Sequence, residues 1–289
     1  MNMKSLNIRT GSFLTTGALS ILMLLGSCDK KEVETTDQDA KLRAADTRVV
    51  PEDLAYVGIE HNAQTDALYD AYVADGVTED ESKEYARTFL IGQIDWTDPE
   101  IGELAEENIN DYFDNPIASY SDDFYPGSLE TDLDSAIKGY LDDLHGIMSI
   151  DGITVSDLNA QVTDLETTIY GDMSLNNDEL CVLFSATQTA KHSYEYWTNN
   201  GDKWMSLDGG AGFDGAAAVE DGAGEATASA VAGDIAKADV GGAVGAAAGA
   251  WVVNVAPGAG QVAYGGAILG GAVGTSVGAG VVKLLDWIW

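Results

Sequence analysis

The feature that most constrains the fold is an uncharged, glycine-rich stretch near the C-terminus. Between Asp239 and Lys283 lie 43 residues without a formal charge, and glycine recurs there at four-residue spacing. Four residues are slightly more than one helical turn, so such a series leaves a groove without side chains on one helix face. The glycines at this spacing are Gly241, Gly245, Gly249, Gly266, Gly270, Gly274 and Gly278.

Helices that carry these glycines need close packing partners. An interior glycine costs about 1 kcal/mol relative to alanine, which tertiary or membrane packing must offset. Two grooves without Cβ atoms let their backbones approach closely. Residues 257–260 read Pro-Gly-Ala-Gly, a turn signal. We therefore predict a helical hairpin with arms at about 240–256 and 261–284. The residues expected at its close contact are Gly245, Gly249, Gly270 and Gly274.

The region before this stretch has the periodicity of amphipathic helices and lacks the two-residue alternation of half-buried strands. The predicted fold class is all-α, with a helical N-terminal domain over 51–205 followed by a glycine-zipper helical hairpin in 240–289. An Asp/Gly/Ala-rich connector, partly helical at best, spans 206–239. The predicted helices are 52–74, 79–94, 99–113, 129–149, 156–170 and 178–199. The predicted core residues include Leu133, Leu144, Leu165, Leu183, Phe184 and Trp197.

The N-terminus has the three parts of an export signal. Lys4 and Arg9 precede an apolar run, which ends in Leu-Gly-Ser-Cys at 25–28. This ending resembles the lipobox of bacterial lipoproteins. We expect residues 1–27 to be a signal peptide, cleaved before Cys28, and the cysteine to carry diacylglycerol and palmitate. We further expect residues 28–50 to form a flexible tether and the protein to be held in the cell envelope at the outer membrane, facing the periplasm or the cell surface.

Charge and metal-binding residue types exclude several function classes. The net charge is −34, which would repel nucleic acid and anionic headgroups, so we expect no nucleic-acid partner. With Cys28 lipidated, Cys181 is alone in an apolar run and is interpreted as a buried residue. His61, His145 and His192 are far apart in the sequence, and neither a zinc-protease motif nor an EF-hand loop is present. We predict no metal site and no cofactor.

His61 is the histidine that most needs an explanation. It lies on the apolar stripe of the first predicted helix, four residues after Val57 and seven before Leu68. Our interpretation is a core histidine with a hydrogen-bonded partner. The alternative is an acid–base role together with Glu60.

Two resemblances to known families bear on the fold. The segment Val57-Gly58-Ile59-Glu60-His61-Asn62, together with residues 185–197, which end in Ser-Tyr-Glu-Tyr-Trp, resembles a family of uncharacterised bacterial lipoproteins with a Gly/Ala-rich tail. That resemblance implies an all-helical fold and no assigned activity. Residues 240–284 resemble the glycine-zipper two-transmembrane segments of outer-membrane lipoproteins and bacteriocin-like peptides. This second resemblance implies membrane contact or self-association, with internal packing as the open alternative.

These observations favour a non-enzymatic lipoprotein that acts through binding or self-assembly. Its expected partners are the membrane, through the lipid anchor, and a second copy, through the hairpin. The alternative is an antibacterial membrane-active toxin that uses the hairpin. A third hypothesis is a hydrolase built around Glu60 and His61.

The anchor hypothesis predicts the behaviour of a Cys28→Ala variant. Without the thiol that receives the lipid, this protein should leave the membrane fraction or persist as an unprocessed precursor. Intact-mass measurement of the native protein checks the same point. A mature N-terminus without added acyl mass would contradict the lipoprotein hypothesis.

Overall fold

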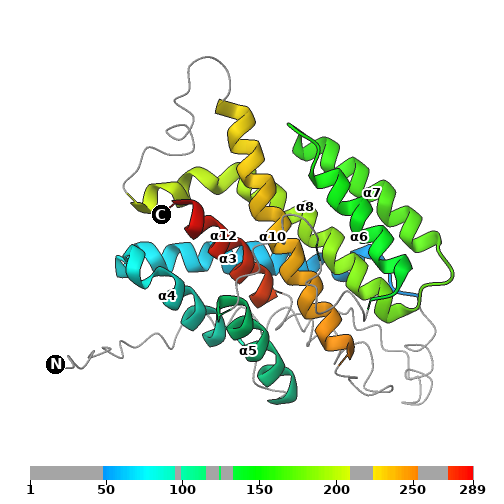
Figure 1. The fold of residues 1–289 in the computed structure, drawn as a ribbon, viewed down its shortest axis with the longest axis horizontal. Coiled ribbons are helices and arrows are strands. Elements are labelled where there is room, and N and C mark those ends of the chain that lie inside the picture. The colour runs from blue at the N-terminus through cyan, green and yellow to red at the C-terminus, as the bar shows by residue number, and fades with distance from the viewer. Residues whose placement is uncertain are drawn as a thin grey trace, which may run out of the picture. The chain divides into compact units, whose positions relative to one another are not determined.

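Every element in the described part of the chain is helical (Figure 1). The computed structural model describes residues 48–94, 99–114, 124, 133–208, 224–252 and 273–288. In chain order, the elements are η1 (Pro51–Leu54), α3 (Ala55–Asp75), α4 (Glu79–Gly92), α5 (Pro99–Asp114), α6 (Ser135–Met148), α7 (Val155–Gly171), α8 (Asn177–Met205), η2 (Ser206–Asp208), α10 (Gly224–Val252) and α12 (Gly274–Ile288). The predicted all-α class is confirmed.

The helices predicted between residues 52 and 199 are all present, but some begin or end elsewhere. The α6 helix begins at Ser135 rather than at 129, because the Asp134 side chain caps it by accepting a hydrogen bond from the Ala136 amide at 2.8 Å. The α8 helix continues to Met205, since Trp204 is fully buried in its last turn. All six predicted core residues are buried, including Leu133, which precedes α6.

The folded domain begins slightly earlier than predicted. Arg48 donates hydrogen bonds to the carbonyl oxygens of Leu175, at 3.0 Å, and Asp172, at 2.5 Å. The Val49 amide donates to the side-chain oxygen of Asn177 at 3.0 Å, and the Val49 side chain is buried. Arg48 and Val49, which we assigned to the tether, are therefore attached to the connection between α7 and α8 and to the first residue of α8.

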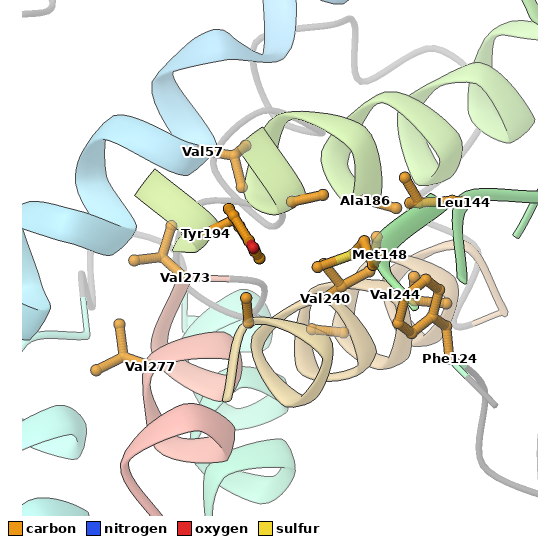
Figure 2. Packing of buried hydrophobic residues seen from close by; sticks show 14 of the residues in the cluster. Val57, Phe124, Leu144, Met148, Ala186, Tyr194, Val240, Val244, Val273 and Val277 are labelled. Carbon is orange, nitrogen blue, oxygen red and sulfur yellow. The ribbon is translucent and has the colours of Figure 1, made fainter. Parts of the chain in front are cut away.

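The glycine-rich helices belong to the same core as the others and do not form a separate hairpin domain. The α10 helix starts at Gly224, so the boundary we placed at 239/240 falls inside a continuous helix. It packs on α8 and α12, and α12 also contacts α3, α4 and α5. Figure 2 shows Val240 and Val244 of α10 close to Met148 of α6, with Val273 near Tyr194 of α8.

The contact between α10 and α12 is close, but it uses other glycines than those we predicted. A Cβ at Gly242 would lie 2.7 Å from the carbonyl oxygen of Thr275 and 2.8 Å from the Cα of Ser276. Three residues earlier in α10, Asp239 lies against Gly280 of α12. Since residue numbers rise in one helix and fall in the other along the contact, the two helices run antiparallel there.

Of the glycines predicted for this contact, Gly274 has a different neighbour, and so does Gly278, another glycine of the four-residue series. A Cβ on Gly274 would meet Ile109, and one on Gly278 would meet Phe113, both residues of α5. The prediction is therefore wrong for Gly274: its open face accommodates side chains of α5 instead of the α10 backbone. Gly241 is buried and Gly245 is half-buried. Outside the described part of the chain lie the surroundings of Gly249, the turn at 257–260, and Gly266 and Gly270.

Among the described helices, none combines the length and the hydropathy needed to cross a membrane.

The close contact at Gly242 predicts a loss of stability on substitution that helix propensity alone would not produce. Gly242→Ala should lower the free energy of unfolding by about 1–3 kcal/mol, because its Cβ would push against backbone atoms of α12 that cannot move alone. Urea unfolding measures this change.

The matched control is Gly139→Ala in α6, where an added Cβ meets no atom within 4 Å. That variant should gain up to about 1 kcal/mol from helix propensity alone. Equal gains for the two variants would contradict the close contact.

Candidate functional site

The centre of the candidate site is the carboxylate of Asp239, which is fully buried in α10. Its Oδ2 atom accepts a hydrogen bond from the Ser193 hydroxyl at 2.5 Å and from the Trp197 indole N–H at 2.7 Å. Ser193 and Trp197 are four residues apart in α8, so they project from the same helix face. Two neutral donors from one helix therefore hold one oxygen of this acid.

The third partner of Asp239 is His61 of α3, which is also fully buried. Its Nε2 lies 3.1 Å from Asp239 Oδ2, an ion-pair contact without the alignment of a hydrogen bond. Its Nδ1 lies 3.0 Å from the side-chain oxygen of Asn62, and the Asn62 amide nitrogen donates to the His192 carbonyl at 3.1 Å. His61 thus has a hydrogen-bond partner at Nδ1 and a carboxylate beside Nε2.

Two glycines make room for this cluster. A Cβ on Gly280 would overlap Asp239 Oδ1, the carboxylate oxygen that has no hydrogen-bond partner. A Cβ on Gly58 would lie 2.7 Å from the Gln188 carbonyl oxygen, so this glycine lets α3 lie directly on α8. The cluster needs both positions to lack side chains.

The environment favours the charged form of His61. Burial disfavours an imidazolium ion, but the negative charge of Asp239 and the hydrogen bond with Asn62 outweigh it, so the pKa of His61 is raised. The neighbouring His192 shows the opposite result. Its burial lowers its pKa, despite the nearby charge of Glu195.

The cluster contains a serine, a histidine and an aspartate, yet their arrangement differs from that of a hydrolase triad. In such a triad, the histidine lies between the serine and the acid. Here Ser193 and His61 both contact the same carboxylate oxygen, and the other His61 nitrogen faces Asn62. His61, Ser193 and Asp239 are each 0% exposed, so no substrate has access to them.

The interpretation of His61 as a core histidine with a hydrogen-bonded partner is confirmed, since His61 is fully buried and its Nδ1 is hydrogen-bonded to the side chain of Asn62. The acid beside its other ring nitrogen is Asp239 of α10, and not the half-buried Glu60 that precedes it in the sequence. Sequence reasoning missed Asp239, because we used it only as the limit of the uncharged stretch. The available signal was an acid inside an apolar helix, which must find a polar partner when it is buried.

The other sequence candidates lie apart from this cluster. The His145 ring packs edge-on against Phe124, with centroids 5.1 Å apart. Cys181 is buried, as predicted, and burial raises its pKa to about 12, so it is a poor nucleophile. Cys28 lies outside the described residues. Within the described part of the chain, no group of histidine, cysteine and acidic residues could hold a metal ion.

Comparisons of the chain with protein-family models, with curated proteins and with solved structures found no match. The two resemblances stated above therefore remain expectations.

The raised pKa of His61 predicts how the stability of the protein changes with pH. The unfolded imidazole titrates near about 6.5. Below that pH the ion pair contributes its full stabilisation, and the contribution is lost as the pH rises through the folded pKa of His61. Urea unfolding of wild type and His61→Gln between pH 5.5 and 9 should show a stability gap that shrinks with rising pH.

His192→Gln is the control for this experiment, because the pKa of His192 is lowered. The stability gap between wild type and this variant should grow as the pH rises through the unfolded value, the opposite trend. A gap for His61→Gln that does not shrink as the pH rises would show that folding does not raise the pKa of His61.

Proposed function

We propose that this chain is a lipid-anchored protein of the cell envelope that acts by binding rather than by catalysis. The observation that supports this proposal best is the complete burial of the Asp239 cluster. This cluster brings together an imidazole, a hydroxyl and a carboxylate, and each of these side chains is completely buried. Such a cluster can stabilise the fold, but it cannot take up a substrate.

The start of the folded domain fits the anchor hypothesis. Arg48 and Val49 are hydrogen-bonded to residues at the end of α7 and the start of α8, so the chain is attached to the domain from Arg48 onward. Cys28 precedes Arg48 by twenty residues. A lipid on Cys28 would therefore be connected to the folded domain through residues that are hydrogen-bonded to that domain.

The packing of α10 and α12 favours binding by the outer surface over membrane attack by these helices. Val273 and residues 274–285 of α12 are buried, except for the half-buried Lys283. Helices that complete the core cannot leave it without exposing that core to water. The same argument weighs against self-assembly through these two helices in the folded state.

A vesicle experiment distinguishes these functions. Purified lipidated protein should float with dye-loaded vesicles without releasing the dye, because the acyl chains insert and the helical domain stays folded. Cys28→Ala is the matched control and should remain in solution. Dye release would favour the membrane-active toxin, whereas failure of the wild-type protein to float would refute the anchor.

A further inference from the structure

A second polar cluster, at the surface between α3 and α8, surrounds a lysine with aromatic rings. The Lys203 ammonium lies 4.9 Å from the ring centroid of Tyr69 and 5.2 Å from that of Tyr196. It also forms an ion pair with the carboxylate of Asp66. We call Tyr69, Tyr196 and Asp66 the tyrosine box.

The composition of the tyrosine box is suited to a cation. A positive charge within about 6 Å of an aromatic centroid is attracted by the negative face of the ring, and two rings act together here. The Asp66 carboxylate adds a full negative charge. By contrast, Arg48 lies over the single ring of Tyr170, and Arg87 over that of Phe113.

The walls of the box are held by groups other than Lys203. The Tyr196 hydroxyl donates to Asp66 at 2.9 Å and accepts from the Trp204 indole N–H at 3.1 Å. The Tyr69 ring packs edge-on against Trp204, with centroids 5.2 Å apart. Trp204 is itself fully buried and packs against Trp197 at 5.7 Å. The box would thus keep its shape if the ammonium left.

The ion pair of Lys203 and Asp66 is the solvent-exposed part of this cluster. The Lys203 side chain is 30% exposed and that of Asp66 is 54% exposed, whereas Tyr196 as a whole is 4% exposed. The lysine ammonium is strongly hydrated and sits on a flexible stem near the end of α8. A quaternary ammonium group is less strongly hydrated and gives up less solvation when it moves onto aromatic faces.

From this geometry we propose that the tyrosine box is a binding site for a quaternary ammonium group, and that Lys203 is its displaceable internal occupant. Choline-type cations belong to this ligand class, either free or as the headgroup of a lipid. The net charge of −34 concentrates cations near the protein surface and favours their access to the box. This inference gives the proposed binding function a ligand, but it does not depend on the lipid anchor.

The decisive variant is Lys203→Ala, which empties the box. If Lys203 occupies the box more than nine-tenths of the time, its removal should tighten the binding of tetramethylammonium by about tenfold or more. Isothermal titration of the full chain in one non-ionic detergent measures this change, with sodium chloride at equal ionic strength as the reference.

Two further variants test the specificity of the effect. Asp66→Asn in the Lys203→Ala background should lose most of the gained affinity, because the full charge of the box is removed. Lys237→Ala removes a lysine that pairs with Asp234 within α10, so it should bind tetramethylammonium as the wild type does.

Two ligands then identify the source of the cation. Binding of choline but not of phosphocholine would point to a free cation, and binding of both would point to a lipid headgroup. Either result supports the proposal.

A Lys203→Ala protein that shows no saturable binding of tetramethylammonium would overturn the proposal. So would equal binding after Asp66→Asn. If Lys203→Ala is too unstable for titration, tetramethylammonium should raise its melting temperature more than sodium does, because a ligand stabilises the folded state that binds it. Failure of that rescue would also overturn the proposal. Since vesicle flotation reports only on the anchor, the two proposals fail separately.

Discussion

The rest of the structure depends on how the domain accommodates one buried carboxylate. Asp239 lies in an apolar helix at the centre of the core, where an unpaired negative charge would cost several kcal/mol. Three helices share that cost. The α8 helix supplies the Ser193 and Trp197 donors, α3 supplies His61, and α12 supplies the open face of Gly280. Because each contribution needs its helix in place, the carboxylate couples the positions of four helices.

This coupling explains why some glycines matter more than others. Gly280 leaves space for the acid, Gly242 lets the α12 backbone approach α10, and Gly58 lets α3 lie directly on α8. A methyl group at any of these three positions would meet backbone atoms or the carboxylate, neither of which can be displaced without moving a helix. Gly139 and Gly146 lie on the exposed side of α6 and have no such neighbour. The packing of α6 therefore does not require these two positions to lack a side chain.

The packing of α3 on α8 creates two polar clusters, one buried and one open to solvent. The Asp239 cluster is sealed and acts as an internal support. The tyrosine box, further along the same pair of helices, opens to solvent at Lys203 and Asp66. Trp197 and Trp204 connect them: Trp197 donates to Asp239, and Trp204 supports both tyrosines of the box. A cation that displaces Lys203 would thus bind beside the fully buried Trp204, where packed neighbours already hold the rings and little ordering is needed on binding.

The sequence by itself determined the local features of this protein. The apolar periodicity predicted the all-α class, the helices between residues 52 and 199, and the burial of residues such as Leu144 and Trp197, because periodicity shows which face of a helix avoids water. It also identified His61 as a core residue that needs a polar partner. The partner itself, Asp239, was decided by the tertiary structure, since a face that must be buried does not specify what buries it. The glycine spacing failed for the same reason. A groove without side chains can accept a backbone or a side chain, and only the packing of α5 against Gly274 and of α12 against Gly242 decided which neighbour each glycine has.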